Sequence, residues 1–279
     1  MPPSRELDSA SSPLAFFAME LRRLREQAGL TQEQLAREIS YSIALISMVE
    51  TGKRNPSRDF TRRCDERLNG GGLLIRIWPL LANTAYSTQF QPWLEIEPQA
   101  HTLRNWEPLL IPGLLQTADY ASAVLRAEPG VSDERAEELV SGRLERQKLL
   151  TKDDPPLFLT VIREEALHLH IGSPEIMHDQ LSALLIAAEH RHISVQIVPS
   201  GLGMTGGTIA GLEGAFIIAG VEGSPDSVFV ESAAAGHVTD HPRDVVAICR
   251  RYEAIRSEAL SARASADLIT KVMKEWQQT

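Results

Sequence analysis

The fold of the first part of the chain is decided by Gly29–Arg54, which reads GLTQEQLAREISYSIALISMVETGKR. Thr31 has the character of a helix N-cap, and Gln34 three residues later completes a capping-box pattern. The apolar periodicity that follows is interrupted at Ser40 and then resumes. Gly52 stands where a residue free to adopt a positive φ is favoured after a helix. The stretch therefore predicts two short helices joined by a tight turn, which is the arrangement of a helix-turn-helix.

Apolar stripes on both sides of this stretch predict two further helices. Upstream, the stripe consists of Leu14, Phe17, Leu21, Leu24 and Ala28. Downstream, a helix that begins near Ser57 carries Phe60, Cys64 and Leu68, and Gly70–Gly72 ends it. We expect residues 14–69 to form a compact, all-helical domain.

The length of 279 residues suits two domains rather than one. We expect a disordered, Pro- and Ser-rich tail over residues 1–12 and a helix-turn-helix domain over 13–72. A connecting segment would cover residues 73–105, and a larger domain for regulation, partner binding and dimerisation would cover 106–279.

Composition and charge place the chain among ordinary globular proteins. Hydrophobic residues make up 43% and charged residues 23%, which is enough for a sizeable core. No apolar run approaches the roughly twenty residues that cross a bilayer, and the start lacks the layout of a signal peptide. We expect a cytoplasmic protein. Its two cysteines, Cys64 and Cys249, form no disulfide or metal motif and are interpreted as small buried hydrophobes.

The net charge of −9 is unevenly distributed. Residues 1–69 hold 11 Lys+Arg against 10 Asp+Glu, whereas the rest of the chain holds 17 against 27. We expect a basic face on the first domain formed by Arg22, Arg23, Arg25, Lys53, Arg54, Arg58, Arg62, Arg63 and Arg67. Since basic contacts supply most non-specific affinity for nucleic acid, a monomer should bind DNA only modestly.

The larger part of the chain mixes strand and helix patterns. We expect strands at Leu157–Ile162, Ile193–Val198, Ala215–Val221 and Ser227–Ser232. Helices are expected at Ser132–Leu150, Pro174–His190, Pro242–Ala262 and Ala264–Trp276, with a shorter one that ends near Arg126. The fold class is therefore α+β: an all-helical domain followed by a mixed α/β domain with a mostly antiparallel sheet.

The first domain resembles the Cro/repressor-type helix-turn-helix family, also called the xenobiotic-response-element type. The resemblance is carried by Gly29–Ala36, Ile46–Ser47 and Glu50–Pro56. In that family the second helix enters the major groove of double-stranded DNA while the first crosses the phosphate backbone. The resemblance implies that bases face Ser42, Ile43, Ala44 and Ser47, and that phosphates are held by Gln32, Lys53 and Arg54.

The side chains expected on the outer face of this recognition helix are unusual for a helix that recognises DNA bases. Ile43 and Ala44 can touch a thymine methyl group but form no hydrogen bond with a base edge. Specificity would then depend on Ser42 and Ser47, on DNA shape, and on the spacing of two half-sites in a dimer. The alternative is that Ile43 packs inward on a shifted helix.

The larger domain resembles the C-terminal domain of actinobacterial regulators of the WhiJ type. The residues that carry this resemblance are Trp106–Pro108, Pro112–Thr117, Asp119–Ala121, Arg143–Gln147 and Val195–Pro199. Such regulators often stand beside a gene for a small protein, as an antitoxin does beside its toxin. The resemblance implies a repressor whose larger domain dimerises and receives a partner or a signal.

Several patterns that suggest chemistry are interpreted here as structural. Gly201–Gly207 has the G-x-G-x-x-G form, but a strand rather than a helix follows it, so we expect no nucleotide site. The pairs His168/His170 and His190/His192 lack convergent ligands, since only His178 with either cysteine could complete a site, so we expect no metal. No nucleophile, metalloprotease or P-loop motif is present, and we expect neither an enzyme nor a cofactor.

We therefore expect a sequence-specific transcriptional regulator, a homodimeric repressor that binds an operator with two half-sites. It would be controlled through the larger domain by a small partner protein or a signal. The alternatives are an antitoxin-like protein that sequesters a small toxin-like partner and regulates its own gene, and a sensor of small molecules.

Overall fold

The computed structural model describes residues 12–56, 58–84, 89–201, 210–232 and 236–278, with the side chains of residue 58 and residues 82–84 left out. The chain divides into two compact units. One consists of Met1–Tyr86 with Ser132–Glu145, and the other of Ser87–Val131 with Arg146–Thr279. The tail expected over residues 1–12 lies outside the described residues except for Ser12.

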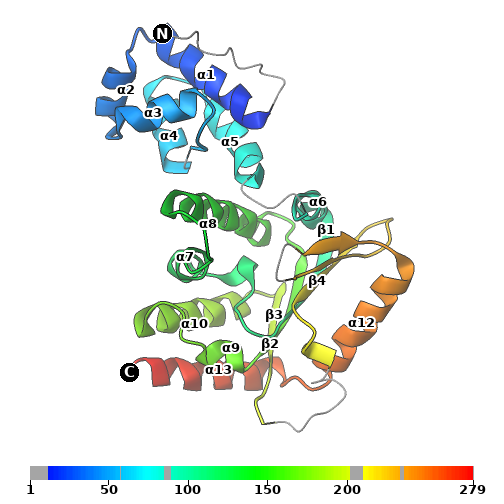
Figure 1. Cartoon of the computed structure of the whole chain (residues 1–279). Coiled ribbons are helices and arrows are strands. Elements are labelled where there is room, and N and C mark those ends of the chain that lie inside the picture. The colour runs from blue at the N-terminus through cyan, green and yellow to red at the C-terminus, as the bar shows by residue number, and fades with distance from the viewer. Residues whose placement is uncertain (1–11, 57, 85–88, 202–209, 233–235, 279) are drawn as a thin grey trace. The chain divides into compact units, whose positions relative to one another are not determined.

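The first unit is helical, as the sequence predicts. Its helices are α1 (Pro13–Gln27), α2 (Gln32–Ile39), α3 (Ile43–Glu50), α4 (Arg58–Arg67) and α5 (Leu73–Thr84), drawn in blue to cyan in Figure 1. Ser12 caps α1, its hydroxyl accepting a hydrogen bond from the backbone N–H of Ala15 at 3.1 Å. This unit also includes Ser132–Glu145, which is most of α8 (Asp133–Gln147) with the residue before it.

One apolar core holds α1 to α5 together. Phe17, Leu21 and Leu24 of the predicted first stripe are buried, Leu14 is partly buried, and Ala28 is exposed because it lies beyond the helix as its C-cap. Phe60, Cys64 and Leu68 are buried as predicted. The core also takes Leu74, Ile77 and Leu81 from α5, so α5 packs as a member of the bundle.

The second unit is built on a six-stranded sheet with the order β3-β2-β1-β4-β5-β6. The strands are β1 (Ala100–Glu107), β2 (Leu157–Arg163), β3 (Ile193–Val198), β4 (Phe216–Val221), β5 (Ser227–Val230) and β6 (His237–Thr239). The pairs β1–β4, β4–β5 and β5–β6 are antiparallel, whereas β1–β2 and β2–β3 are parallel. The predicted α+β class with a mostly antiparallel sheet is confirmed.

Helices cover both faces of this sheet (Figure 1). α7 (Ala118–Arg126), α10 (Pro174–Ala188) and α13 (Ala262–Trp276) pack on one face, and α12 (Pro242–Arg256) packs on the other. Shorter segments complete the unit: α6 (Gln91–Ile96), η1 (Glu97–Gln99), η2 (Gly113–Leu115), η3 (Lys148–Thr151) and α9 (Glu165–His168). Because both faces are covered, the central strands are buried on both sides, as in parallel sheets generally.

The sequence pattern does not predict the central strand β1, because it assigns Ala100–Asn105 to a connecting segment and Trp106–Pro108 to an irregular one. Polar residues interrupt the apolar pattern by which this strand could be recognised in the sequence. Asn105, although 5% exposed, accepts a hydrogen bond from the Thr160 hydroxyl of β2 at 2.9 Å. Arg104 forms an ion pair with Asp226 across the sheet. These charges and amides are satisfied only by tertiary partners, so neither an alternating nor a continuous apolar pattern marks the strand.

The remaining predicted strands are observed within one or two residues, and the short edge strand β6 is an addition. The helix predicted from Pro242 ends at Arg256, before α13 begins at Ala262.

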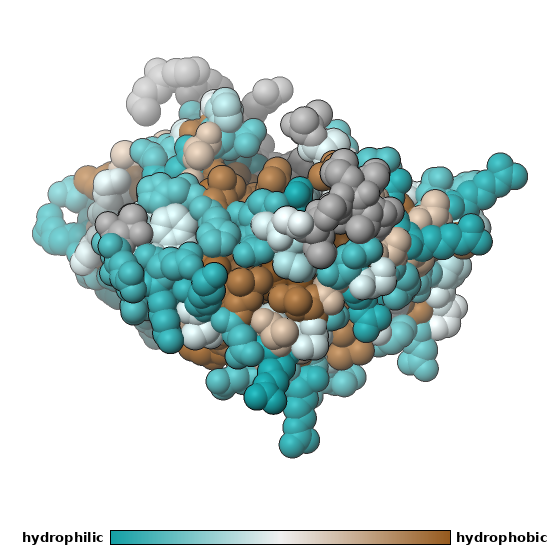
Figure 2. Space-filling model, turned by 90° about the horizontal axis from the view of Figure 1, so that it is seen from below, coloured by the Kyte–Doolittle hydropathy of each residue, from teal (hydrophilic) through white to brown (hydrophobic). Residues whose placement is uncertain are grey.

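Viewed from the side along which α13 runs, hydrophobic residues gather in the middle of the face and hydrophilic residues surround them (Figure 2). In the described part of the chain, no helix has the length and apolarity that crossing a membrane requires.

Candidate nucleic-acid interface

The first helix of the motif, α2, begins with the predicted capping box. The Thr31 hydroxyl accepts a hydrogen bond from the backbone N–H of Gln34 at 3.1 Å, and the Gln34 side-chain oxygen accepts one from the backbone N–H of Thr31 at 2.8 Å. These reciprocal bonds satisfy two N–H groups that a helix start leaves without partners. They fix where α2 begins.

The turn between α2 and α3 depends on two serines. Ser40 adopts the left-handed conformation at φ 61°, ending α2 and reversing the chain. A left-handed residue that is not glycine is uncommon, although short polar side chains tolerate it better than bulky ones. Ser42 then caps α3, its hydroxyl oxygen accepting a hydrogen bond from the backbone N–H of Leu45 at 3.2 Å. After α3, Gly52 has the predicted positive φ, 65°.

The recognition helix α3 presents the predicted base-facing residues outward. Ser42 and Ala44 are exposed, Ile43 is 47% exposed, and Ser47 is half-buried. Ile46 and Val49 face the core, which fixes the rotation of the helix. The alternative in which Ile43 packs inward is therefore wrong. The exposed end of α3 offers two apolar side chains beside the Ser42 hydroxyl.

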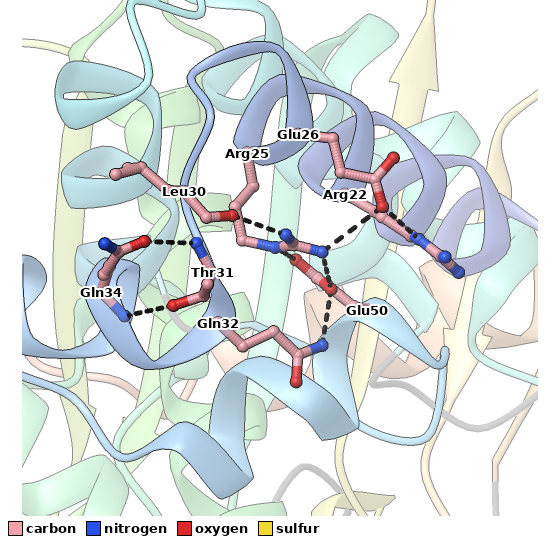
Figure 3. Close-up of polar contacts among 8 residues, drawn as sticks. All are labelled: Arg22, Arg25, Glu26, Leu30, Thr31, Gln32, Gln34 and Glu50. Carbon is pink, nitrogen blue, oxygen red and sulfur yellow. Dashed lines mark hydrogen bonds and ion pairs between the residues drawn. The ribbon is translucent and has the colours of Figure 1, made fainter.

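A buried polar network links α3 to the two helices before it (Figure 3). The Arg25 guanidinium of α1 donates to Glu50 at the end of α3, with Nε to Oε1 at 2.5 Å and Nη2 to Oε2 at 2.9 Å. It also donates from Nη1 to the Leu30 carbonyl at 2.8 Å. The Gln32 amide, at the start of α2, donates to Glu50 Oε2 at 2.7 Å. Glu50 thus holds three helices of the motif in one geometry.

Two residues that the sequence places at the DNA-facing surface, Arg25 and Gln32, take part in this network. Arg25 is expected on a basic outer face, but its side chain is only 10% exposed and neutralises Glu50. Gln32 is expected to hold a phosphate, and one of the two N–H groups of its amide donates within the domain, to Glu50. The sequence pattern does not predict Glu50 and Arg25 as partners. The spacing does indicate their burial. Glu50 lies four residues after the buried Ile46 and Arg25 lies four residues after the buried Leu21, so each shares the buried face of its helix.

Most of the other predicted basic residues are also matched by carboxylates. On α1, Arg22 pairs with Glu26 at 2.8 Å and Arg23 with Glu20 at 2.6 Å. On α4, Arg62 pairs with both Asp59 and Glu66, and Arg63 pairs with Asp59. Arg67 pairs with Glu38 of α2. The Arg62 guanidinium, with Tyr41 and Arg63, lowers the pKa of Asp59, so this carboxylate stays ionised.

Lys53 and Arg54 differ from these arginines. Lys53 is exposed and Arg54 is half-buried in the turn that follows α3. In the described part of the first unit, neither forms an ion pair, although Arg22, Arg62, Arg63 and Arg67 all do. Arg54 acts electrostatically on Glu134, whose pKa it helps to lower, so Lys53 is the more available of the two cations beside α3.

The histidines that lie in pairs in the sequence make separate local contacts. His170 stacks on Trp276, His168 lies 3.7 Å from Glu164, and the rings of His190 and His192 are 5.6 Å apart. Among the described residues, no three or more His, Cys, Asp or Glu side chains gather as metal ligands. Positions 202–207 of the glycine-rich motif lie outside the described residues. Cys64 is buried and Cys249 half-buried, and burial raises the pKa of both thiols.

Comparison with known families supports this location of the site. A helix-turn-helix domain model matches residues 17–76, and the model of a domain of unknown function (DUF5753) matches residues 90–271. Searches of curated proteins and of solved structures give no significant match. The helix-turn-helix match points to a DNA-binding regulator, and the match to DUF5753 assigns no activity to residues 90–271.

Proposed function

Because the chain belongs to the family of the domain of unknown function DUF5753 and carries a helix-turn-helix domain before it, we propose that it is a sequence-specific transcriptional regulator. It acts in the cytoplasm as a homodimeric repressor of the WhiJ type. A small partner protein or a signal controls it through the second unit. The observation that carries the DNA-binding part is the exposed start of α3 followed by the cationic turn of Lys53 and Arg54.

The chemistry of α3 supports a dimer. Ser42 and Ser47 are the only hydroxyl side chains among its four proposed base-facing residues, because Ile43 and Ala44 offer only hydrocarbon. A good bidentate contact to a base discriminates by about 1–3 kcal/mol, and α3 has no side chain that forms one. Two copies of the helix, spaced on successive major grooves, double the contacts and add the half-site spacing as a source of specificity.

Footprinting on the protein's own promoter over a salt series tests this proposal. We expect protection of two half-sites about one helical turn, ~34 Å, apart. Affinity should fall as salt rises, because Lys53 and Arg54 release counterions from the phosphates. Protection of a single half-site at all protein concentrations would contradict the dimer, and an affinity independent of salt would contradict the phosphate contacts.

The antitoxin-like and small-molecule-sensing functions make different predictions. An antitoxin-like protein forms a stable complex with a small protein and relieves its toxicity even when Lys53 and Arg54 are replaced by alanine. A regulator controlled by such a partner loses repression with the same replacements. A sensor of small molecules changes its thermal stability with a metabolite and needs no protein partner.

A further inference from the structure

The two edges of the sheet in the second unit differ in how their backbone groups are used. At the β3 edge, the backbone N–H of Ile197 donates to the Ser265 hydroxyl at 2.9 Å, and its carbonyl accepts from the backbone N–H of Leu260 at 2.9 Å. The Gln196 amide also donates to the Leu260 carbonyl at 2.9 Å. Leu260 and the start of α13 therefore close this edge to another strand.

The β6 edge is different, and the register shows which groups point outward. The backbone N–H of Glu231 donates to the Ala215 carbonyl, so the odd-numbered residues at this end of β5 bond toward β4. The alternate residues Val228 and Val230 then bond toward β6, where they pair with Thr239 and His237. Val238, between these two, directs its N–H and C=O away from the sheet. No described strand pairs with that side of β6.

A pocket lies on each face of the sheet beside β6. On the α12 face, a pocket of about 290 Å³ is lined by Thr239 with Phe216 and Ile248. On the opposite face, a pocket of about 380 Å³ is lined by Val238 with Pro92 and Ile96. His237 borders both. Successive side chains of an extended chain point to opposite faces, so a strand added to β6 would direct them alternately into the two pockets.

The charges at these pockets favour a basic occupant. Asp244 and Glu213 line the first pocket and Asp240 lines the second. Arg251 also lines the first pocket, but its guanidinium pairs with Glu213. The Asp244 carboxylate, which is exposed, accepts a hydrogen bond from the Thr239 hydroxyl at 3.3 Å. Asp240 and Asp244 supply negative charge at the two pockets, with the His241 ring 4.0 Å from Asp244, while Ile248, Pro92 and Ile96 supply apolar walls.

We propose that the β6 edge binds an extended segment of another protein that alternates basic and apolar side chains. The segment adds to the sheet as a seventh strand, bonding to the N–H and C=O of Val238 and placing its side chains in the two pockets. This mode of recognition obtains affinity from the main chain and specificity from alternate side chains. The inference rests on the proposed control of the regulator through its second unit, and assigns a site to that control.

Binding of a labelled peptide to the full chain tests the site. The probe is a fluorescein-labelled six-residue peptide of alternating lysine and valine, and the control has glutamate in place of each lysine. A third peptide carries N-methyl groups on alternate residues, which remove the main-chain donors facing β6. We expect saturable fluorescence anisotropy with the lysine peptide, and at least about tenfold weaker binding for each of the other two. Equal binding of the N-methylated peptide would overturn strand addition.

Two variants of the protein locate the peptide. Val238→Pro removes the outward N–H while leaving the bonds of His237 and Thr239 to β5, and proline is tolerated on edge strands. Val238→Thr keeps the N–H and the branched shape. We expect Val238→Pro to weaken binding of the lysine peptide about tenfold and Val238→Thr to leave it within twofold. Equal affinities of the two variants, or no binding of the lysine peptide to the wild type, would overturn the proposal.

Two parallel measurements distinguish a peptide site at the β6 edge from a dimer interface and from the DNA-binding function. Sedimentation shows whether Val238→Pro converts a dimer into monomers, in which case a second copy of the chain occupies the edge and the proposal of a different protein is wrong. Footprinting with Val238→Pro should give the wild-type pattern. Peptide binding by a wild-type protein that fails to bind DNA would refute the proposed function and leave the β6 site intact.

Discussion

Arg25 and Glu50 form a two-point ion pair inside the first unit, and their side chains are only 10% and 2% exposed. Removing one partner of a buried pair leaves the other charged and without compensation, which destabilises a protein by ~3–5 kcal/mol. The Gln32 amide depends on the same carboxylate. The orientation of α3 is therefore coupled to a buried charge at its C-terminal end, opposite the exposed end that carries Ser42 and Ile43.

Glu50→Ala should destabilise the first unit by ~3–5 kcal/mol, because Arg25 is left buried without its partner. The thiol of Cys64 reports on this, since it is fully buried in the core of the same unit. Iodoacetamide reaches Cys64 when that core opens, so the rate of Cys64 labelling in Glu50→Ala should exceed that in the wild type by about a hundredfold or more. Glu33→Ala, at the exposed pair with Arg37, is the matched control and should change the rate little. Similar rates of Cys64 labelling in both variants would show that the buried pair contributes no more to stability than an exposed pair does.

In the wild-type protein, iodoacetamide should modify Cys249 well before Cys64. Burial raises the pKa of both thiols, so both are protonated at neutral pH, but Cys249 is only half-buried. The thiolate is the reactive form, and access to it differs between the two. Mass spectrometry of peptides after timed labelling measures the order. Modification of Cys64 first, under conditions that keep the protein folded, would contradict the packing of α4.

Lys53→Ala and Arg54→Ala should each weaken DNA binding on all sequences alike, because phosphate contacts carry no sequence information. Each change should reduce the slope of log affinity against log salt by ~0.9. Arg62→Ala is the control on a neighbouring helix, because Arg62 already pairs with Asp59 and Glu66. Gel shifts over a salt series provide the measurement. A larger effect from Arg62→Ala than from Lys53→Ala would reverse the assignment.

Ile43→Arg should alter sequence preference more than Lys53→Ala does. Ile43 is 47% exposed at the start of α3, and an arginine there can form a bidentate contact with guanine. Selection from a random operator library, before and after the change, measures the preference. We expect a gain of guanine at one position in each half-site. A uniform change of affinity with unaltered preference would show that Ile43 does not face bases.

Glu97→Ala should destabilise the second unit in the same way that Glu50→Ala affects the first. Glu97 is 2% exposed and accepts hydrogen bonds from Arg146 at 2.7 and 2.9 Å and from the Trp93 indole at 2.9 Å. We expect a loss of ~3–5 kcal/mol, measured by hydrogen exchange of the amides in β1 and α6. Glu95→Ala, at an exposed position two residues earlier, is the control. Equal exchange in both variants would refute the role of Glu97.

Local signals in the sequence are sufficient to predict much of this structure. The capping box of Thr31 and Gln34, the positive φ of Gly52 and the Ser173 cap of α10 are properties of a few neighbouring residues. They do not depend on the rest of the chain. The exposure of Ile43 is not among them, because the sequence leaves two rotations of α3 open, and the burial of Ile46 and Val49 in the structure decides between them.

What the sequence does not indicate depends on partners distant along the chain. Asn105 and Arg104 make β1 look irregular, because Thr160 and Asp226, which satisfy them, are far away in the sequence. Gln32 looks available to a phosphate until Glu50 is placed beside it. The parallel pairing of β1, β2 and β3 is also a property of the whole topology. In each case the missing information is a long-range pairing.

The closure of the β3 edge by Leu260 and Ser265 also limits how this protein can assemble. A sheet that can be extended at both ends permits stacking without end, which is how fibres grow. Here the β3 edge is closed, so copies of this chain cannot add head to tail through the sheet, and pairing of β6 with β6 ends at two copies. Complexes made through it have a fixed stoichiometry, and raising the protein concentration fills sites without producing filaments.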